Sequence, residues 1–358
     1  MSPTTIVLFI SGLALLLVGA DLLIRGASAI AKRLGISPLI IGLTVVSLGT
    51  SAPEIAVSLT SALAGEADMA LGNVVGSNIF NVLGILGITA LAAPLIVQRQ
   101  LIRVDVPIMI VASALCYLVA HDGTISRADG IGLIVGAVLY VALLIRISRR
   151  SADTQPDAPP SGPVWLRNLP AQLLLILVGL GLLVIGSRWL VDGATEIARL
   201  LGVSDLIIGL TIIAAGTSLP ELATSVLAAM KGERDIAVGN VVGSNIMNIL
   251  LVLGATSALA PAGVPVAPEA LRFDIPVMIA VALACLPSFI TGSVVSRAEG
   301  AFFVAYYVAY TVFLILSSQQ HDGLAAFSAA MMYFAVPLTA AVLLFALVQE
   351  FRGRRAAP

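Results

Sequence analysis

The chain has 358 residues, of which 59% are hydrophobic and only 11% are charged, and its mean hydropathy is +1.06. Soluble domains carry about a quarter charged residues, so this composition excludes a globular domain with a water-exposed surface. The net charge of −1 gives no sign of a nucleic-acid partner, and the two cysteines, Cys116 and Cys285, are too few and too widely spaced for a disulfide framework or a metal cluster.

Apolar runs of about 20 residues, enough to cross a bilayer as a helix, recur from one end of the chain to the other. They lack the period-two alternation of a transmembrane β-barrel, so they predict an all-α polytopic membrane protein. We expect about eleven transmembrane helices, near residues 4–24, 37–64, 69–93, 102–120, 127–147, 170–190, 204–230, 236–260, 272–290, 298–317 and 324–349. Residues 149–169, rich in Pro, Ser and Asp, predict a flexible linker after the fifth helix.

The distribution of Lys and Arg predicts the orientation in the membrane. Most of the 19 basic residues fall in the loops of one side, which include the linker and the C-terminal tail. Because basic loops remain in the cytoplasm, we expect the N-terminus outside and both the linker and the C-terminus inside. Asp21 and Arg25, and in the second half Arg188 and Asp192, are spaced i, i+4 and are expected to form local salt bridges near a membrane boundary.

Two long motifs occur twice in the chain. GLTVVSLGTSAPE (Gly42–Glu54) matches GLTIIAAGTSLPE (Gly209–Glu221) at eight of 13 positions, and GNVVGSNIFNVLG (Gly72–Gly84) matches GNVVGSNIMNILL (Gly239–Leu251) at ten of 13. Both pairs are separated by 167 residues. The sequence therefore predicts an internal repeat.

The repeat divides the chain into two halves of five spans, residues 1–148 and 170–317, followed by residues 318–358 with an additional C-terminal helix and a basic tail. Because five is odd, the second half enters the membrane from the opposite side. Inverted repeats of this kind are typical of secondary transporters, whose substrate site lies near the midplane where the halves meet. We therefore expect two inverted five-helix repeats around a central site.

The second span of each half carries the sequence G-T-S-x-P-E. In the first half Thr50, Ser51 and Glu54 are spaced so that their oxygens share one helical face. Pro53 has no N–H to donate and clashes with the carbonyl four residues earlier, which opens the helix there. A carbonyl released in hydrocarbon is costly unless something else satisfies it; a bound cation is one such partner, and water in a polar cavity is another. The second half repeats this arrangement around Glu221.

The third span of each half carries a polar stripe and a glycine pair. Asn73, Ser77 and Asn81 recur every four residues, and the second half repeats them as Asn240, Ser244 and Asn248. The accompanying G-x-x-x-G pairs allow another helix to approach closely. The ligand groups of both spans are all oxygen, which suits hard cations such as Ca²⁺ and Na⁺, and the absence of clustered Cys or His argues against zinc and copper.

Charge gives the stronger reason to expect a cation. A carboxylate at the bilayer centre costs at least ~2.5 kcal/mol, and two facing carboxylates also repel. A divalent cation neutralises both, and Na⁺ ions or protons can do so in an alternate step, which is the chemical basis of exchange. Ser and Thr alone could simply bond their own helix carbonyls, and the glycines could serve packing alone. Two membrane-embedded glutamates after helix-breaking prolines favour a cation site instead.

Two other classes of protein would use similar residues. A cation channel could be built on the same acidic ring, although an inverted repeat with broken helices favours a transporter. An intramembrane hydrolase needs a general base beside its nucleophile, and the predicted spans offer no embedded His or Lys for that purpose. We therefore predict a transporter rather than an enzyme, with no cofactor.

The paired GTSAPE/GTSLPE and GNVVGSNIFN/GNVVGSNIMN segments resemble the two α-repeats of the Ca²⁺/cation antiporter superfamily, most closely its prokaryotic sodium/calcium exchangers. The resemblance covers roughly residues 1–317. It implies a fold of ten helices in two inverted repeats, exchange of Ca²⁺ for Na⁺, small cations and the lipid bilayer as partners, and a location in a prokaryotic inner (plasma) membrane. It also implies that the first and sixth helices slide against the remaining core.

The resemblance implies a set of ligands at positions of this chain. The Ca²⁺ ligands would be Glu54 and Glu221 with the backbone carbonyls of Thr50 and Thr217. The Na⁺ sites would share the two acids and add Ser51, Ser77, Ser218 and Ser244, with backbone oxygens from Ser47 and Ala214. Asn81 and Asn248 would border the centre.

The chain departs from the family pattern in three respects. Some relatives carry an acid where this chain has Asn248, so only two acids remain in the expected site. Proton-coupled members tend to carry an acid where this chain has Gly76 and Gly243, which favours Na⁺ over H⁺; H⁺/Ca²⁺ exchange and K⁺-dependent exchange remain the alternatives. The helix after residue 318 has no counterpart in the ten-helix pattern, and the sequence gives no indication of its role or of the oligomeric state.

Overall fold

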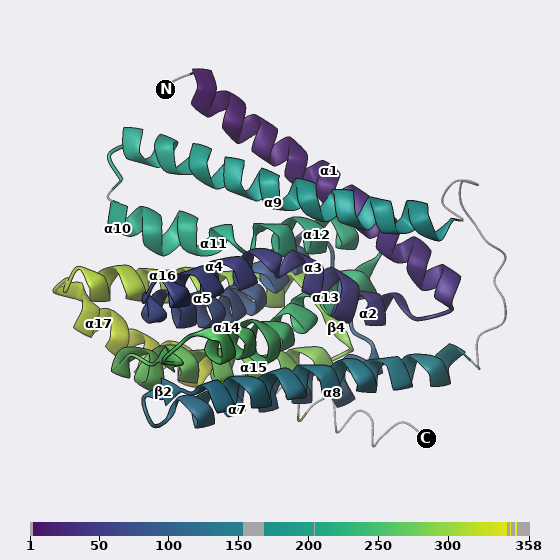
Figure 1. The fold of residues 1–358 in the computed structure, drawn as a ribbon. Coiled ribbons are helices and arrows are strands. Elements are labelled where there is room, and N and C mark those ends of the chain that lie inside the picture. Colours follow the sequence, from purple (N-terminus) through teal and green to yellow (C-terminus); the bar gives the residue numbers. More distant parts are fainter. Residues whose placement is uncertain (1–2, 153–167, 204, 342–343, 345–347, 349–358) are drawn as a thin grey trace.

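A computed structural model describes residues 3–152, 168–203 and 205–341 together with 344 and 348, and almost all of them are helical (Figure 1). The first half contains α1 (Pro3–Leu34), α2 (Pro38–Ile41), η1 (Gly42–Val46), α3 (Ser47–Thr50), α4 (Ala52–Leu63), α5 (Ala67–Phe80), η2 (Asn81–Leu86), α6 (Gly87–Ala92), η3 (Leu101–Asp105), α7 (Val106–Ala120) and α8 (Arg127–Ala152), where η marks π-helical segments.

The second half contains the equivalent elements in the same order. They are α9 (Leu169–Leu200), α10 (Asp205–Ile208), η5 (Gly209–Ile213), α11 (Ala214–Gly216), α12 (Leu219–Met230), α13 (Arg234–Met247), η6 (Asn248–Leu253), α14 (Gly254–Leu259), η7 (Ala270–Asp274), α15 (Ile275–Ile290) and α16 (Arg297–Ser318). The chain continues into α17 (Gly323–Ala330) and η8 (Met331–Ala335).

The helices agree with the predicted membrane spans. Within the described part of the chain, nine helices are long and apolar enough to cross a bilayer, and Pro38–Thr50 with Ala52–Leu63 forms a tenth span bent by 42°. The predicted seventh span is interrupted in the same way, and its apolar helix Leu219–Met230 is shorter than a full span. The predicted helix 324–349 is described as Gly323–Ala341, and its end, the basic tail and most of the linker 149–169 lie outside the described residues.

The helices α1 and α9 are longer than predicted. Both have 32 residues, which at about 1.5 Å per residue is more than the ~30 Å hydrocarbon core requires, so they lie tilted across the others (Figure 1). The predicted spans, 4–24 and 170–190, ended close to the first charged residues of each helix, Asp21 and Arg188, but charge at a membrane boundary does not end a helix. Each helix instead continues to a turn beyond Leu34 and Leu200.

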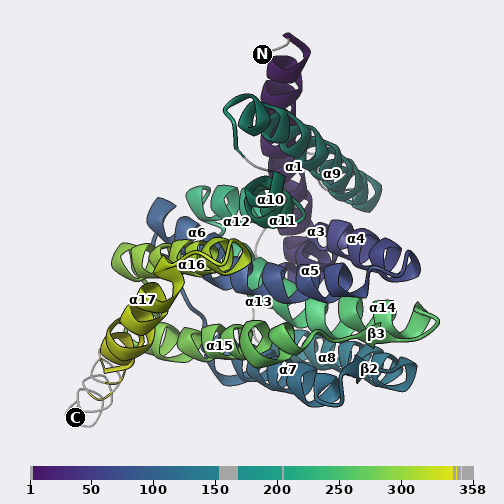
Figure 2. The ribbon, with the colours of Figure 1, turned by 90° about the vertical axis from the view of Figure 1, so that its left-hand side faces the viewer.

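Regularly spaced glycines allow the backbones of α1 and α9 to pack in direct contact. Three glycines at seven-residue intervals lie on each helix, at equivalent positions of the two halves: Gly12, Gly19, Gly26, Gly179, Gly186 and Gly193. A Cβ on Gly12 would lie 2.5 Å from the backbone N of Leu190, and one on Gly179 would lie 2.7 Å from that of Leu23. The two backbones therefore touch along the helices, and Figure 2 shows the pair standing out from one edge of the bundle.

The other helices interlock the two halves. Helix α8 of the first half packs on α14 of the second, α16 packs on α6, and α7 packs on α15. Two antiparallel ribbons also join the halves, β1 (Leu95–Ile96) with β4 (Val294–Val295) and β2 (Thr124–Ile125) with β3 (Val264–Pro265). These four two-residue strands are a small correction to the all-α prediction, and each follows a span where the chain leaves the bundle.

The last helix is a peripheral addition. It packs on α16, where the hydroxyl of Tyr306 donates a hydrogen bond to the carbonyl of Ala335 at 3.0 Å. Its large apolar side chains, including Met332, Tyr333 and Phe334, are exposed, and Figure 2 shows α17 projecting from the bundle away from α1 and α9. The central site is built without it.

Candidate cation site

The G-T-S-x-P-E motifs interrupt their helices as the prolines predict. Helix α3 ends at Thr50 and α4 begins at Ala52, with Pro53 in its first turn. In the second half α11 ends at Gly216, and α12 begins at Leu219 with its proline again in the first turn. The interruptions place the polar residues of each motif at a helix end inside the bundle.

The carbonyl released in the second half has a protein partner. Ser187 of α9 donates its hydroxyl to the carbonyl of Gly216 at 2.8 Å. A neighbouring helix therefore supplies a donor for this carbonyl, a partner that the sequence analysis did not consider beside an ion or water. The position equivalent to Ser187 in the first half is Ala20, which has no hydroxyl.

The two motif glutamates are fully buried and meet across the halves. Glu54 and Glu221 both have 0% exposure. The hydroxyl of Ser218 donates to Glu54 Oε1 at 2.9 Å, and that of Ser51 donates to Glu221 Oε1 at 3.1 Å. Each half thus holds the carboxylate of the other, which brings the predicted pair of acids into one centre.

Asparagines of the third and eighth spans bind the same segments. Asn73 Nδ2 donates to Ser58 Oγ at 2.8 Å and to the Glu54 carbonyl at 3.3 Å, and its Oδ1 accepts from the Thr217 hydroxyl at 3.2 Å. The mirror contacts run from Asn240 to Ser225 Oγ at 3.0 Å and the Glu221 carbonyl at 3.4 Å, and from the Thr50 hydroxyl to Asn240 Oδ1 at 3.1 Å. The threonine hydroxyls are therefore used within the protein, and the ligand role of the threonine carbonyls stays a prediction.

A second pair of asparagines was missed by the sequence analysis. Asn81 Nδ2 donates to Asn245 Oδ1 at 3.1 Å, and Asn248 Nδ2 donates to Asn78 Oδ1 at 3.1 Å. Asn78 and Asn245 belong to the repeated G-S-N-I segment but lie one residue off the predicted stripe, on a different helical face. Their identity in both repeats was the signal that could have indicated them.

Six buried oxygens of this centre lack a hydrogen-bond partner among the described residues, and they form three symmetric pairs. They are Glu54 Oε2, Glu221 Oε2, Ser77 Oγ, Ser244 Oγ, Asn81 Oδ1 and Asn248 Oδ1. Leaving a buried polar atom unpaired costs about 1–3 kcal/mol. Hard cations are bound by such oxygens, so the donor set fits the predicted chemistry.

The charge of the centre is set by the two glutamates. Within the described chain, no group of three or more His, Cys, Asp or Glu residues lies together, so no third acid joins Glu54 and Glu221. The neutral Asn248 occupies the position where some relatives were expected to carry an acid. The centre can thus carry up to two negative charges.

The two predicted backbone ligands that precede the G-T-S-x-P-E segments lie in different surroundings. Ser47 is fully buried, its hydroxyl donates to the Leu43 carbonyl at 2.8 Å, and its own carbonyl accepts from the N–H of Ser51 at 3.1 Å. Its symmetry equivalent, Ala214, is exposed. The structure therefore covers one side of the centre and leaves the other side more open.

Glycines of α13 and α5 show the same asymmetry. A Cβ on Gly239 would lie 2.8 Å from the carbonyl of Leu39, and one on Gly243 would lie 2.8 Å from Leu43 Cα, so α2 and η1 press on α13. The equivalent Gly72 and Gly76 of α5 have no atom of the described structure within 4 Å of such a Cβ. The segment α10–η5 is thus not packed on α5 in this conformation.

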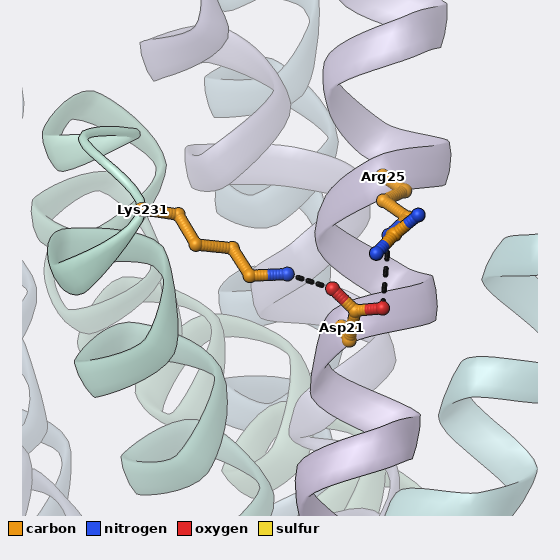
Figure 3. A network of polar contacts seen from close by, with 3 residues as sticks. All are labelled: Asp21, Arg25 and Lys231. Atoms are coloured by element: carbon orange, nitrogen blue, oxygen red, sulfur yellow. Dashed lines mark ion pairs between the residues drawn. The ribbon is translucent and has the colours of Figure 1, made fainter. Parts of the chain in front are cut away.

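An ion pair ties α1 to the core on the covered side (Figure 3). The carboxylate of Asp21 binds Arg25 of the same helix at 2.8 Å, as predicted, and also binds Lys231 in the turn after α12. Ala64 stands at the position equivalent to Lys231, and the expected Arg188–Asp192 pair is not formed in the part of the chain described. The Asp21–Lys231 ion pair and the Ser187–Gly216 hydrogen bond therefore have no mirror equivalents, and both stabilise the conformation seen here.

Comparison with known proteins identifies the family. The family model described as sodium/calcium exchanger protein matches residues 4–146 and 171–316, one segment in each half. The chain is 43% identical over 316 residues to the putative antiporter CaxA of Alkalimonas amylolytica, covering 86% of this chain and 97% of that protein. It is 32% identical over 349 residues to the sodium/calcium exchanger MaX1 of Methanosarcina acetivorans, covering 88% and 99%.

A solved structure has the same fold. The sodium/calcium exchanger from Methanococcus jannaschii superposes with a TM-score of 0.75 at 29% identity, covering 87% of this chain and 99% of that one. The expected two inverted five-helix repeats are thereby confirmed. The chain belongs to the sodium/calcium exchanger protein family and is a membrane cation antiporter.

Proposed function

We propose that this antiporter exchanges Ca²⁺ for Na⁺ at a site formed by Glu54 and Glu221. The observation that carries the proposal is the crosswise bonding of Ser51 and Ser218, which brings both carboxylates into one buried centre and leaves one oxygen of each unpaired. One Ca²⁺ balances the two charges, and Na⁺ ions compete for the same oxygens. The two buried carboxylates therefore always have a cation that balances their charge in the bilayer interior.

The remaining ligands follow from the donor set. Ca²⁺ binds six to eight oxygens at about 2.3–2.6 Å, so the two acids need further partners, for which we propose the carbonyls of Thr50 and Thr217. For Na⁺ we propose the same acids with the hydroxyls of Ser51, Ser77, Ser218 and Ser244 and backbone oxygen from Ser47 and Ala214, while Asn81 and Asn248 border the centre.

Alternating access is supported by the asymmetry around this site. On one side of the site, α2 and η1 pack closely on α13. On the other side, α10 and η5 do not pack on α5, which leaves that side open. We propose that the α1–α9 pair slides across the core and exchanges these two arrangements. With the N-terminus outside in a prokaryotic inner membrane, the conformation described here is open toward the exterior.

Na⁺ loaded into everted membrane vesicles is expected to drive Ca²⁺ uptake, because the exchanger couples the outward flux of one ion to the inward flux of the other. Uptake is measured with a Ca²⁺ dye. It is compared with the uptake of vesicles loaded with choline or K⁺ and of vesicles that have only an imposed pH gradient. Uptake driven by the pH gradient without Na⁺ would show H⁺/Ca²⁺ exchange, a strict need for K⁺ would show K⁺-dependent exchange, and single-channel currents would show a channel.

A further inference from the structure

The side-chain amide of Asn78 can face in one direction only. Its Nδ2 donates to the backbone carbonyl of Asn245 at 3.2 Å and to the sulfur of Met278 at 3.6 Å, and its Oδ1 accepts from Asn248 Nδ2 at 3.1 Å. A carbonyl oxygen and a thioether sulfur accept hydrogen bonds and cannot donate them. Turning the amide over would place acceptor against acceptor, so the oxygen of Asn78 must face Asn248.

This orientation determines how Asn248 presents its own amide. Because Asn78 offers an acceptor, Asn248 must turn its N–H₂ group toward it, and its Oδ1 points elsewhere. That oxygen is buried, has no partner among the described residues and belongs to the six unpaired oxygens of the centre. An ionised aspartate at this position would place a carboxylate oxygen against Asn78 Oδ1, which accounts for a neutral residue here.

The other half repeats the arrangement. Asn245 Nδ2 donates to the sulfur of Met109 at 3.4 Å, its Oδ1 accepts from Asn81 Nδ2 at 3.1 Å, and Asn81 Oδ1 is left unpaired. Met109 and Met278 occupy matching turns of α7 and α15 and are 1% and 2% exposed. Four asparagines and two methionines thus form two related chains of hydrogen bonds, each ending at an unpaired oxygen; the bond from Asn78 to the Asn245 carbonyl joins the chains and has no mirror among the contacts of the described residues.

We propose that Asn78 and Asn245 are positioning residues that hold the Oδ1 atoms of Asn248 and Asn81 toward the transported cations, and that the sulfurs of Met278 and Met109 fix the orientation of Asn78 and Asn245. The inference rests on the proposed ion site and deepens it. Neither positioning residue donates an atom to the ion. Each acts through one asparagine of the opposite half, so the two ligand amides are oriented across the repeat.

The substitution Asn78→Leu is expected to raise the Na⁺ concentration for half-maximal exchange by about tenfold, as loss of a partner of a metal ligand typically does. Leucine has a similar volume but leaves the buried Nδ2 of Asn248 without its partner, so the melting temperature should fall modestly while the protein stays folded and the maximal rate stays close to that of the wild type. Met109→Leu should raise the Na⁺ requirement as well. Met247→Leu is the matched control, since Met247 is 1% exposed but its sulfur accepts no hydrogen bond from the described residues.

Double variants separate positioning from a general structural role. Asn78→Leu should add nothing when Asn248→Leu is already present, because Asn78 acts through Asn248. It should keep its full effect in an Asn81→Leu background, which belongs to the other hydrogen-bond chain. In the reciprocal experiment, Asn245→Leu should not change the Na⁺ requirement further in an Asn81→Leu background. It should keep its full effect in an Asn248→Leu background.

Two results would overturn the inference: an unchanged Na⁺ requirement in Asn78→Leu, or an effect that adds equally in both backgrounds. The outcome is independent of the proposed site itself, which is tested by Glu54→Gln and Glu221→Gln. If those variants lose exchange while the asparagine variants behave as the wild type, the ion site stands and the positioning role alone is wrong. If the glutamate variants retain exchange, the ion site is wrong as well.

Discussion

Glu221→Gln is expected to lower Na⁺-driven Ca²⁺ exchange by at least about 100-fold. Removing one partner of a buried charge arrangement costs about 3–5 kcal/mol, and each 1.4 kcal/mol is a factor of about ten. Glutamine keeps the shape of the side chain and still accepts the hydrogen bond from Ser51, so the fold should persist. Glu54→Gln should behave in the same way, because Ser218 makes the mirror contact. Exchange is measured in vesicles or proteoliposomes with a Ca²⁺ dye.

The matched control for these variants is Glu66→Gln. Glu66 lies in the exposed turn between α4 and α5, away from the buried pair. The Glu66→Gln variant should exchange Ca²⁺ at the wild-type rate, and melting temperatures should show that all three variants are folded. Wild-type flux in either Glu54→Gln or Glu221→Gln would refute the proposed site.

Gly76→Leu is expected to abolish exchange while leaving Ca²⁺ binding intact. In the conformation described here a Cβ at Gly76 meets no atom within 4 Å, so a side chain added there begins in open space. In the mirror arrangement α10 and η5 would have to approach α5 as η1 approaches Gly243, where a Cβ would lie 2.8 Å from Leu43 Cα. A leucine cannot be accommodated at that distance, so the open side cannot close. On the same preparation, Ca²⁺ flux should therefore be lost while equilibrium Ca²⁺ binding is retained.

Gly132→Leu serves as the control for added bulk. Gly132 is an exposed glycine of α8, and a Cβ added there, as at Gly76, would have no described atom within 4 Å. Both binding and flux should remain normal in this variant. If Gly76→Leu also exchanges Ca²⁺ at the wild-type rate, α10 and η5 do not close onto α5.

Much of the fold followed from the sequence because the two halves carry the same motifs at one offset. The repeat predicted the number of spans in each half, the inversion and the meeting of Glu54 with Glu221. The prolines predicted where the second and seventh spans break. These features depend on local backbone chemistry and on helix periodicity, which a single sequence contains.

The contacts between helices were harder to predict. The seven-residue spacing of glycines in α1 and α9 was present in the sequence and could have indicated a close helix pair. By contrast, the Ser187 bond to Gly216 and the Lys231 bond to Asp21 depend on how α1 and α9 sit on the core. No periodicity within one helix determines which helix lies beside it, so these contacts required the tertiary structure.

Sr²⁺, a divalent analogue of Ca²⁺ with an anomalous signal, tests the central claim most directly. Crystals grown without Ca²⁺ and soaked in Sr²⁺ should show one anomalous peak between the carboxylates of Glu54 and Glu221, near their unpaired Oε2 atoms. High Na⁺ should displace it, since both ions use the same acids. A Sr²⁺ peak at a different place, or none at concentrations that support transport, would contradict the account.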